Sequence, residues 1–524
     1  MPETVLVSGE GLTVVDLAAI ARDGAGVGLA PGARERIRAA REVVARAARD
    51  GRRVYGVTTG FGSLSDVNIP PADARALQKN LLRSHACGVG EPLARDVVRA
   101  TLALKLNTFA RGTSGVREEI ADAIAALLEH DVVPVVPSQG SVGASGDLAP
   151  LAHLFLPLIG EGEVWRDGRR APAGESMRGT GRALLALEPI EGLALINGTQ
   201  VMTAIAALAA HDARRLLGAA QVAAALSVDA LRGSVAPFRA EFRGARAHPG
   251  AVSVAANLAR LLDGSPINAS HKDCSRLQDA YSLRTTAAVL GAAVEAHGYA
   301  LRVVEREMNA DTGNPLVVAE TGEILSGGNF HGEPVALASD FLAIALAEVA
   351  SIAERRVNRL VDPRLSELPA FLTKHAGLHS GMMIAQYTAA ALVSENKVLA
   401  HPASVDSIPT SAEKEDHVSM GTIAARKAES ILRNAERVVA IELLAAAQAI
   451  EFLRPLETTE ALEAVHRAVR VVSPTLEEDR PLAPDIEAVA RLVREGRIVD
   501  AAQRAAGPLE WPREDEADPH HAAW

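Results

Sequence analysis

The sequence predicts a mainly α-helical protein in which a long central helical bundle follows a smaller mixed N-terminal domain. Ala and Leu dominate the apolar residues of the 524-residue chain, which is 48% hydrophobic but only 3% aromatic. These residue types favour helix packing over strand pairing. From residue 199 onward, long Ala- and Leu-rich stretches follow one another. Many of them are apolar on more than one face, as the buried helices of a bundle are.

The predicted N-terminal domain covers residues 1–198 and mixes short strand-like runs with helices. Residues 4–7 and 54–58 are β-prone, whereas 33–49 and 71–84 have helical patterns, and prolines open the second of these helices. Prolines and glycines between Pro134 and Gly143 then interrupt the chain. A further helix is expected over 148–158, directly after a glycine-rich loop.

The predicted bundle covers residues 199–509, and several of its helices exceed the ordinary globular length. We expect these helices over 199–226, 277–309, 334–360, 382–400 and 420–449. The last segment, 510–524, is charged and contains Pro512 and Pro519, so we expect a poorly ordered end.

Composition and charge exclude several classes of function. The net charge is −11, so there is no excess of Lys and Arg to neutralise the phosphates of a nucleic acid. The two cysteines form no metal or disulfide motif, and the chain has no His-Glu-x-x-His or P-loop segment. The apolar stretch 201–210 is too short to span a bilayer, and no signal peptide is visible at the N-terminus. We therefore expect a cytoplasmic protein with no metal and no membrane partner.

The most informative segment is the glycine-rich loop that holds Ala144, Ser145 and Gly146. If the backbone bends sharply enough, the amide nitrogen of Gly146 can attack the carbonyl carbon of Ala144. Glycine tolerates the distortion and has no side chain to block the approach. The ring formed by this attack would lose one water, and loss of the Ser145 hydroxyl as a second water would leave an exocyclic methylidene. This group is a strong electrophile. The alternative interpretation is an ordinary Gly/Ser turn before a helix.

The extended segment 143–151, Gly-Ala-Ser-Gly-Asp-Leu-Ala-Pro-Leu, resembles the signature of the aromatic amino acid ammonia-lyase family. The resemblance covers about residues 7–499 and at least six separate segments. It implies the ammonia-lyase (fumarase/aspartase-like) fold and a methylidene-imidazolone group (MIO) formed from Ala144-Ser145-Gly146 without an external cofactor. It also implies a helical homotetramer in which each active site draws residues from three subunits.

A second segment, 278–284, resembles the family's Gln-Asp-x-Tyr-Ser-Leu-Arg motif. By that resemblance Tyr281 is the base that removes the β-proton, although a tyrosine is a poor base at neutral pH unless its phenolate is stabilised. Arg284 would clamp the substrate carboxylate with two hydrogen bonds, which its planar guanidinium suits. Gln278 would lie beside the MIO. The alternative is a polar helix with a buried tyrosine.

Three further residues lie in segments that match the family. Tyr55, in 55–62, would take part in proton handling on a mobile loop, and the alternative is a structural Gly-rich loop. Asn197, in 195–199, would contact the MIO and the substrate carboxylate, although Asn is also a preferred helix N-cap. Phe330, in 327–334, would pack near the MIO or be an ordinary core residue.

Two positions bear on the substrate side chain. The Ser84-His85 pair resembles that of the histidine-specific enzymes, although some tyrosine aminomutases also carry it. Glu415, in 411–420, also resembles the histidine pattern, because a carboxylate can accept an imidazole N–H but would be unpaired against a phenyl ring. The alternative is a solvated Glu in a charged loop, as we expect for Glu413.

Together these resemblances imply conversion of L-histidine to trans-urocanate and ammonia. His85 and Glu415 would hold the imidazole, while Arg284 and Asn197 would hold the carboxylate. Two alternatives stay open on the sequence. One is a tyrosine or phenylalanine ammonia-lyase, or an MIO aminomutase. The other is a non-catalytic, helical oligomeric scaffold.

Overall fold

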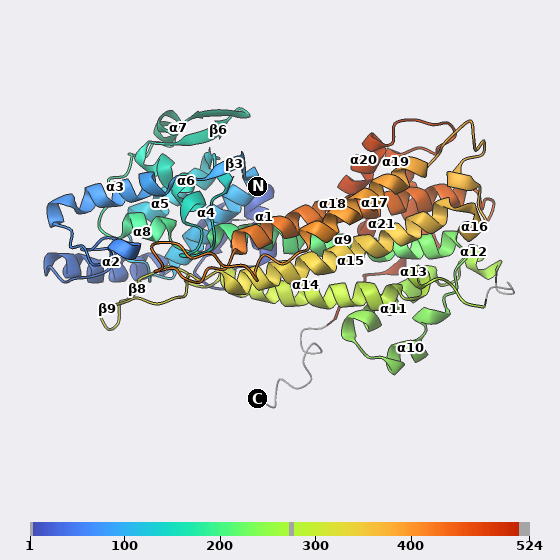
Figure 1. The fold of residues 1–524 in the computed structure, drawn as a ribbon, viewed down its shortest axis with the longest axis horizontal. Coiled ribbons are helices and arrows are strands. Elements are labelled where there is room, and N and C mark those ends of the chain that lie inside the picture. Colours follow the sequence, from blue (N-terminus) through green and yellow to red (C-terminus); the bar gives the residue numbers. More distant parts are fainter. Residues whose placement is uncertain (1–3, 272–276, 513–524) are drawn as a thin grey trace. The chain divides into compact units, whose positions relative to one another are not determined.

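The structure, a computed structural model, describes residues 4–271 and 277–512 (Figure 1). Helices dominate this part of the chain, and its strands are short and form only small sheets. The predicted mainly α-helical fold is therefore confirmed. The chain divides into two compact units, which we describe separately. The loop-bearing unit comprises Met1–His211, Ala300–Asp340 and Pro402–Arg426, and the helical unit comprises Asp212–Tyr299, Phe341–His401 and Lys427–Trp524.

The loop-bearing unit combines helices of moderate length with short strands. Its helices are α1 (Val14–Arg22), α2 (Ala33–Arg49), α3 (Ala74–His85), α4 (Arg95–Ala110), α5 (Glu118–Glu129), α6 (Leu148–Phe155), α7 (Ala173–Gly179) and α8 (Glu191–Ile196). Its short 3-10 turns are η1 (Gly62–Leu64), η2 (Pro71–Asp73) and η3 (Leu156–Ile159). Its strands are β1 (Val5–Val7), β2 (Val27–Leu29), β3 (Val89–Pro92), β4 (Val133–Pro134), β5 (Pro137–Gln139), β6 (Glu163–Arg166), β7 (Arg169–Pro172), β8 (Leu316–Val318) and β9 (Glu323–Leu325).

Helix α4 is the centre of the loop-bearing unit. Every residue from Val97 to Ala110 is buried, and the helix packs against α1, α2 and α5. The strands lie around this helical core: β1 pairs with β2 in parallel, while β3–β5, β4–β6–β7 and β8–β9 are antiparallel. Because α4 is buried on all sides, its polar residues Lys105, Asn107 and Thr108 are buried as well.

Four long helices contain the boundaries between the two units. They are α9 (Gln200–Ala230), α14 (Thr286–Met308), α15 (Glu333–Val361) and α18 (Gly421–Glu451). The compact units are therefore composed differently from the contiguous domains 1–198 and 199–509 that the sequence predicts, since each unit takes in several separate stretches of chain. No composition shift marks a boundary that lies inside a helix, which is why the sequence does not reveal this division.

The helical unit is built from long helices (Figure 1). Buried polar side chains join several of them. On α18, Glu442 accepts hydrogen bonds from Ser227 of α9 (2.7 Å) and Arg356 of α15 (2.9 Å), and all three residues are buried. Asn434 of α18 donates to Asn396 of α17 at 2.9 Å. The unit also contains α10 (Ala240–Ala245), α11 (Pro249–Leu262), α12 (Pro266–Ala269), α13 (Tyr281–Arg284), α16 (Pro363–Ser366), α17 (Met383–Leu399), α19 (Glu460–Val472), α20 (Ala483–Arg494), α21 (Arg497–Ala506), η4 (Ala236–Phe238) and η5 (Ala370–Leu372).

Most predicted elements are confirmed, and one is wrong. The helices predicted over 33–49, 71–84, 199–226, 334–360, 382–400 and 420–449 all form, within a few residues of their predicted ends. The stretch 277–309 becomes α13 and α14. Residues 54–58, predicted as a strand, form turns instead. Gly56 has a φ of 73°, and the Thr58 hydroxyl accepts the Val54 N–H at 2.9 Å, so local bonds replace strand pairing.

The predicted tail begins with residues that are held in place. The backbone of Glu510 exchanges two hydrogen bonds with the Asn257 side chain, at 2.8 and 2.9 Å. The guanidinium of Arg214 lies 4.2 Å from the ring centre of Trp511. The remainder of that segment, 513–524, lies outside the described residues.

Two described helices, α14 and α15, are long and apolar enough to cross a membrane by length and composition alone. Neither helix includes the stretch 201–210, the only one that the sequence analysis tested for the length needed to span a bilayer. Their most apolar windows are 50% and 61% buried within the protein, and buried core helices of soluble proteins pass the same test. The absence of a membrane partner stays a prediction.

Candidate active site

A cavity of about 620 Å³ in the loop-bearing unit brings together several of the predicted site residues. Tyr55, His85, Ser145, Asn197 and Glu415 all line it, although they come from separate segments of the chain. Most of the remaining wall is apolar and is formed by Phe61, Leu64, Val67, Ile69, Leu77, Leu81, Leu148, Leu193 and Ile196. Apolar walls with a few convergent polar groups are typical of a site for a small molecule.

The Ala144-Ser145-Gly146 loop pairs with the segment that carries Asn197. The Gly198 N–H donates to the Ser145 carbonyl at 3.2 Å, and the Asp147 N–H donates to the Gly198 carbonyl at 2.8 Å. Gly146 has a φ of 77°, and a Cβ there would lie 2.0 Å from the Gly198 carbonyl oxygen. Only glycine fits this position, so the pairing that fixes the loop depends on it.

Asp147 anchors the loop from behind, a role that the sequence analysis missed. Its buried carboxylate accepts the N–H groups of Val201 (3.0 Å) and Met202 (2.9 Å), and also the hydroxyls of Ser141 (2.9 Å) and Thr422. Burial raises the pKa of Asp147, and these four donors act in the opposite direction by favouring the carboxylate. In the sequence, Asp147 is an acidic residue just before a predicted helix, a position that indicates an N-cap of that helix. The side chain instead caps the distant helix α9.

Three helices begin next to the loop. Helix α6 begins at Leu148, α9 begins at Gln200 beside the paired Gly198, and α18 begins at Gly421. The Met420 N–H, just before α18, donates to the Val142 carbonyl at 2.9 Å. A helix N-terminus carries partial positive charge, so the loop lies in an electron-withdrawing environment. The sequence predicted the α6 start directly after the loop, whereas only folding brings the other two starts beside it.

Glu415 reaches the loop from a tight turn. Its carboxylate accepts the Ser145 hydroxyl at 3.3 Å and the Thr410 hydroxyl at 2.7 Å. The backbones of Thr410 and Glu415 also pair, and residues 411–413 have φ values of 52°, 51° and 64°. This turn leaves Glu413 exposed, whereas Glu415 lines the cavity. The two acidic side chains thus differ as the sequence analysis expected.

His85 ends helix α3 and contributes an imidazole to the cavity wall. Its Nδ1 lies 3.0 Å from the Ser84 hydroxyl oxygen. Burial lowers the pKa of His85, and the negative charge of Glu415 acts in the opposite direction. The burial effect prevails, so the neutral imidazole predominates at neutral pH.

Tyr55 closes another side of the cavity. Its hydroxyl oxygen accepts the Gly62 N–H at 3.2 Å, and its ring packs edge-on against Phe61. Burial raises the pKa of Tyr55, and the charge of Glu415 raises it further. Its hydroxyl therefore keeps its proton at neutral pH and can serve as a hydrogen-bond donor.

Asn197 presents an unused acceptor to the cavity. The residue is buried, and its Oδ1 has no hydrogen-bond partner in the described structure. It follows helix α8, whereas α9 begins only at Gln200, so its side-chain oxygen caps neither helix. A buried acceptor without a partner is costly unless a ligand satisfies it.

The other predicted residues lie elsewhere, and none is among the described residues that line the cavity. Phe330 is half-buried in the loop-bearing unit, and Gln278 is exposed in the helical unit. Tyr281 is 69% exposed on α13, so the alternative of a buried tyrosine is wrong. The Arg284 guanidinium lies 4.7 Å from the Tyr281 ring centre, and its buried Nε has no hydrogen-bond partner among residues 4–271 and 277–512.

Comparisons with known proteins identify the family of the chain. The family described as aromatic amino acid lyase matches residues 12–471 of this chain. The chain belongs to the aromatic amino acid lyase family.

The chain is 53% identical over 502 residues to a histidine ammonia-lyase from Symbiobacterium thermophilum, covering 96% of this chain and 99% of that protein. It is 52% identical to a histidine ammonia-lyase from Anaeromyxobacter sp. strain K, covering 95% and 99% respectively. The fold resembles the crystal structure of histidine ammonia-lyase from Trypanosoma cruzi, with a TM-score of 0.89, 42% identity and coverage of 98% and 96%. Tyrosine aminomutase from Streptomyces globisporus is similar too, with a TM-score of 0.91, 39% identity and coverage of 98% and 100%.

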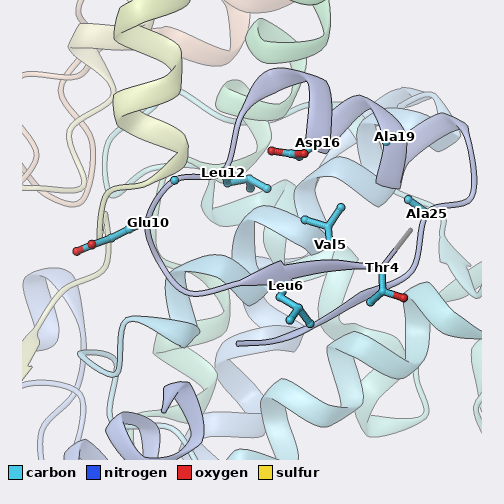
Figure 2. A pocket seen from close by; sticks show the side chains of 9 residues that line it. Thr4, Val5, Leu6, Glu10, Leu12, Asp16, Ala19 and Ala25 are labelled. Carbon is cyan, nitrogen blue, oxygen red and sulfur yellow. The ribbon is translucent and has the colours of Figure 1, made fainter. Parts of the chain in front are cut away.

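Two other features of this aromatic amino acid lyase resemble binding sites. Figure 2 shows a second cavity, of about 370 Å³, at the N-terminal strand and α1, where Thr4, Glu10 and Asp16 are its polar lining residues. It contains none of the predicted site residues. His375 and His379 have a His-x-x-x-His spacing that the sequence analysis missed, but no group of three metal-binding side chains occurs among residues 4–271 and 277–512.

Proposed function

We propose that this chain is a histidine ammonia-lyase, which converts L-histidine to trans-urocanate and ammonia. Glu415 carries the proposal, because its carboxylate lines the same cavity as His85 and lies 3.3 Å from the Ser145 hydroxyl. A carboxylate in a largely apolar cavity needs a donor, and an imidazole N–H supplies one where a phenyl ring cannot. The identity of over 50% to enzymes named histidine ammonia-lyase supports the same substrate.

We further propose that Ala144, Ser145 and Gly146 cyclise to an MIO. The Gly146 nitrogen bonds to the Ala144 carbonyl carbon with loss of one water, and Ser145 loses its hydroxyl as a second water. The residues present fit this group: the positive φ of Gly146 needs glycine, and the Ser145 carbonyl, which the ring retains, already has a backbone donor. The MIO would supply an electrophile for the substrate amine.

The side chains around the cavity then orient the substrate. Glu415 accepts one imidazole N–H, and the neutral ring of His85 offers a second hydrogen-bonding group. Asn197 Oδ1, which has no partner in the described structure, accepts a hydrogen bond from the substrate amine, and the Asn197 amide N–H groups donate to the substrate carboxylate. The protonated Tyr55 hydroxyl donates to the substrate from the cavity wall. Phe61, Leu64 and the other apolar lining residues exclude water, which strengthens each of these polar contacts.

The base and the carboxylate clamp, Tyr281 and Arg284, come in this proposal from another copy of the chain. Two observations support this: Tyr281 is largely exposed, and Arg284 Nε has no hydrogen-bond partner among the described residues. Tyr281 would remove the β-proton of histidine, and Arg284 would bind its carboxylate by two hydrogen bonds. Gln278 and Phe330 would complete the surroundings of the MIO.

Exposed apolar side chains on the helical unit support self-association, and we propose a homotetramer. Neighbouring helices α15 and α17 are linked by the Gln386–Glu354 hydrogen bond of 2.8 Å. They expose the large side chains of Phe341, Ile344, Ile384, Tyr387 and Val398. Large exposed apolar side chains on neighbouring helices often mark an interface. A cytoplasmic location remains the expectation from the sequence.

An absorbance assay with L-histidine, L-tyrosine and L-phenylalanine tests the function. The proposal expects a conjugated acrylate from histidine alone. An acrylate from tyrosine or phenylalanine would show that the proposed substrate is wrong. A β-amino acid, detected by chromatography, would indicate an aminomutase. Loss of two waters from the peptide that contains Ser145, measured by mass spectrometry, tests the MIO separately.

A further inference from the structure

A buried amine lies directly behind the loop. Lys105 on α4 is only 1% exposed, and its Nζ donates to the Asn197 carbonyl at 2.6 Å. A second, longer contact of 3.4 Å joins Nζ to Gln200 Oε1. A lysine is almost never fully buried without a specific partner, and here the main partner is a peptide carbonyl rather than a carboxylate.

That peptide connects Lys105 to the electrophile. The carbonyl of the Asn197–Gly198 peptide accepts from Lys105, and the N–H of the same peptide donates to the Ser145 carbonyl at 3.2 Å. Hydrogen bonds in a chain polarise one another, so a cation on the carbonyl side makes the N–H a stronger donor. The Ser145 carbonyl is retained on cyclisation and is conjugated with the methylidene.

We propose that Lys105 is a positioning residue that acts through the Asn197–Gly198 peptide to withdraw electron density at the Ser145 carbonyl. This raises the reactivity of the methylidene toward nucleophiles. The inference rests on the proposed function, because it requires the cyclised loop. Lys105 itself does not touch the substrate, and its effect resembles that of a donor in an oxyanion hole, one peptide removed.

The surroundings of Lys105 fix the position of its amine, and two nearby carboxylates oppose the loss of its charge. Burial lowers the pKa of Lys105 to about 7, while the carboxylates of Asp311 and Asp147 act in the opposite direction. The Gln200 amide that faces Nζ is itself held by the hydroxyls of Thr108 (3.2 Å) and Thr312 (3.1 Å). The amine is therefore held in one place, with its shortest contact on the peptide that meets the loop.

The test compares Lys105→Met with Thr101→Val in the full-length protein. Both residues are buried on α4, but the Thr101 hydroxyl donates to the Val97 carbonyl of the same helix, whereas Lys105 donates to the Asn197 carbonyl. Three quantities are measured: the mass of the peptide containing Ser145, the rate of covalent modification by cyanide, and kcat and KM for L-histidine. Cyanide reports the electrophile independently of substrate binding and turnover.

We expect Lys105→Met to keep the mass loss of two waters but to lower the cyanide rate and kcat together, by about ten- to a hundredfold, with KM changed much less. Thr101→Val should retain both rates. Unchanged rates in Lys105→Met, or equal losses in Thr101→Val, would overturn the inference. An uncyclised or inactive unaltered protein would instead contradict the proposed function.

Two further variants keep the test decisive if Lys105→Met does not fold. Lys105→Arg keeps a cationic donor and should retain most of the cyanide rate. Lys105→Gln keeps only a neutral donor and should lower that rate. Equal cyanide rates for the Arg and Gln variants would show that the charge has no role and would contradict the inference.

Discussion

In the loop-bearing unit, the candidate residues surround one cavity and are held by defined partners: Glu415 by Thr410, and the Ser145 carbonyl by Gly198. In the helical unit, Tyr281 is 69% exposed, and among the described residues Arg284 Nε is buried without a hydrogen-bond partner. A catalytic group normally needs fixed geometry, which the described residues provide for the first set and not for the second. The proposed shared active site accounts for this difference, because the second set would acquire its partners by assembly.

We expect the largest effect from a substitution in the loop-bearing unit that prevents formation of the electrophile. Ser145→Ala leaves no hydroxyl to lose, so the methylidene cannot form. We expect turnover of histidine to fall by at least about 10³-fold and the Ser145 peptide to lose no second water. Initial rates and peptide mass measure both effects. A fully active Ser145→Ala variant would contradict the mechanism.

The next largest effect is expected from Tyr281, one of the residues that we propose another copy of the chain contributes. Tyr281→Phe removes the proposed base and should lower kcat by about 10²–10⁴-fold, with circular dichroism unchanged because the side chain is exposed. Tyr299→Phe is the matched control, since Tyr299 is another partly exposed tyrosine of the helical unit, and it should retain activity.

Co-expression of Tyr281→Phe with Ser145→Ala sharpens the same comparison. If copies share active sites, some sites in a mixed assembly receive Ser145 from one chain and Tyr281 from another. Activity should then exceed that of either variant alone. A mixed assembly, isolated with two different tags, that shows no gain would mean that Tyr281 and Ser145 act within one chain.

A smaller effect is expected from the residue that selects the substrate. Glu415→Gln replaces a charged acceptor of the imidazole with a neutral one, and kcat/KM for histidine should fall by about ten- to a hundredfold. Glu413→Gln removes the same charge from an exposed position in the same turn and should change kcat/KM less than twofold. Equal values for the two variants would contradict the assignment of the cavity.

The smallest expected effect concerns protonation of His85. Because burial lowers its pKa, the NMR titration midpoint of this ring should lie below 6.5, identified by its absence in His85→Gln. The unfolded chain binds this proton more readily, so the contribution of His85 to stability is present above pH 6.5 and is lost as the pH falls below it. A midpoint above 6.5 would mean that Glu415 outweighs burial.

The sequence predicts the helices well because Ala- and Leu-rich periodicity is a local property. Through the resemblance, its local motifs also distinguish Glu415, which lines the cavity, from Glu413, which is exposed. It does not reveal Lys105 or Asp147, whose partners lie 50 to 100 residues away, near Asn197 and Val201. The strand predicted at 54–58 fails for a related reason. Its residues are β-prone, but the positive φ of Gly56 and the hydrogen bond from the Val54 N–H to the Thr58 hydroxyl favour a turn instead.

The most direct test of the central claim measures the reaction product with each of three amino acids. Purified protein is mixed with L-histidine, L-tyrosine or L-phenylalanine, and the absorbance of the conjugated acrylate is followed. The account predicts trans-urocanate from histidine and no acrylate from the other two. An acrylate from tyrosine or phenylalanine, or none from histidine, would contradict it.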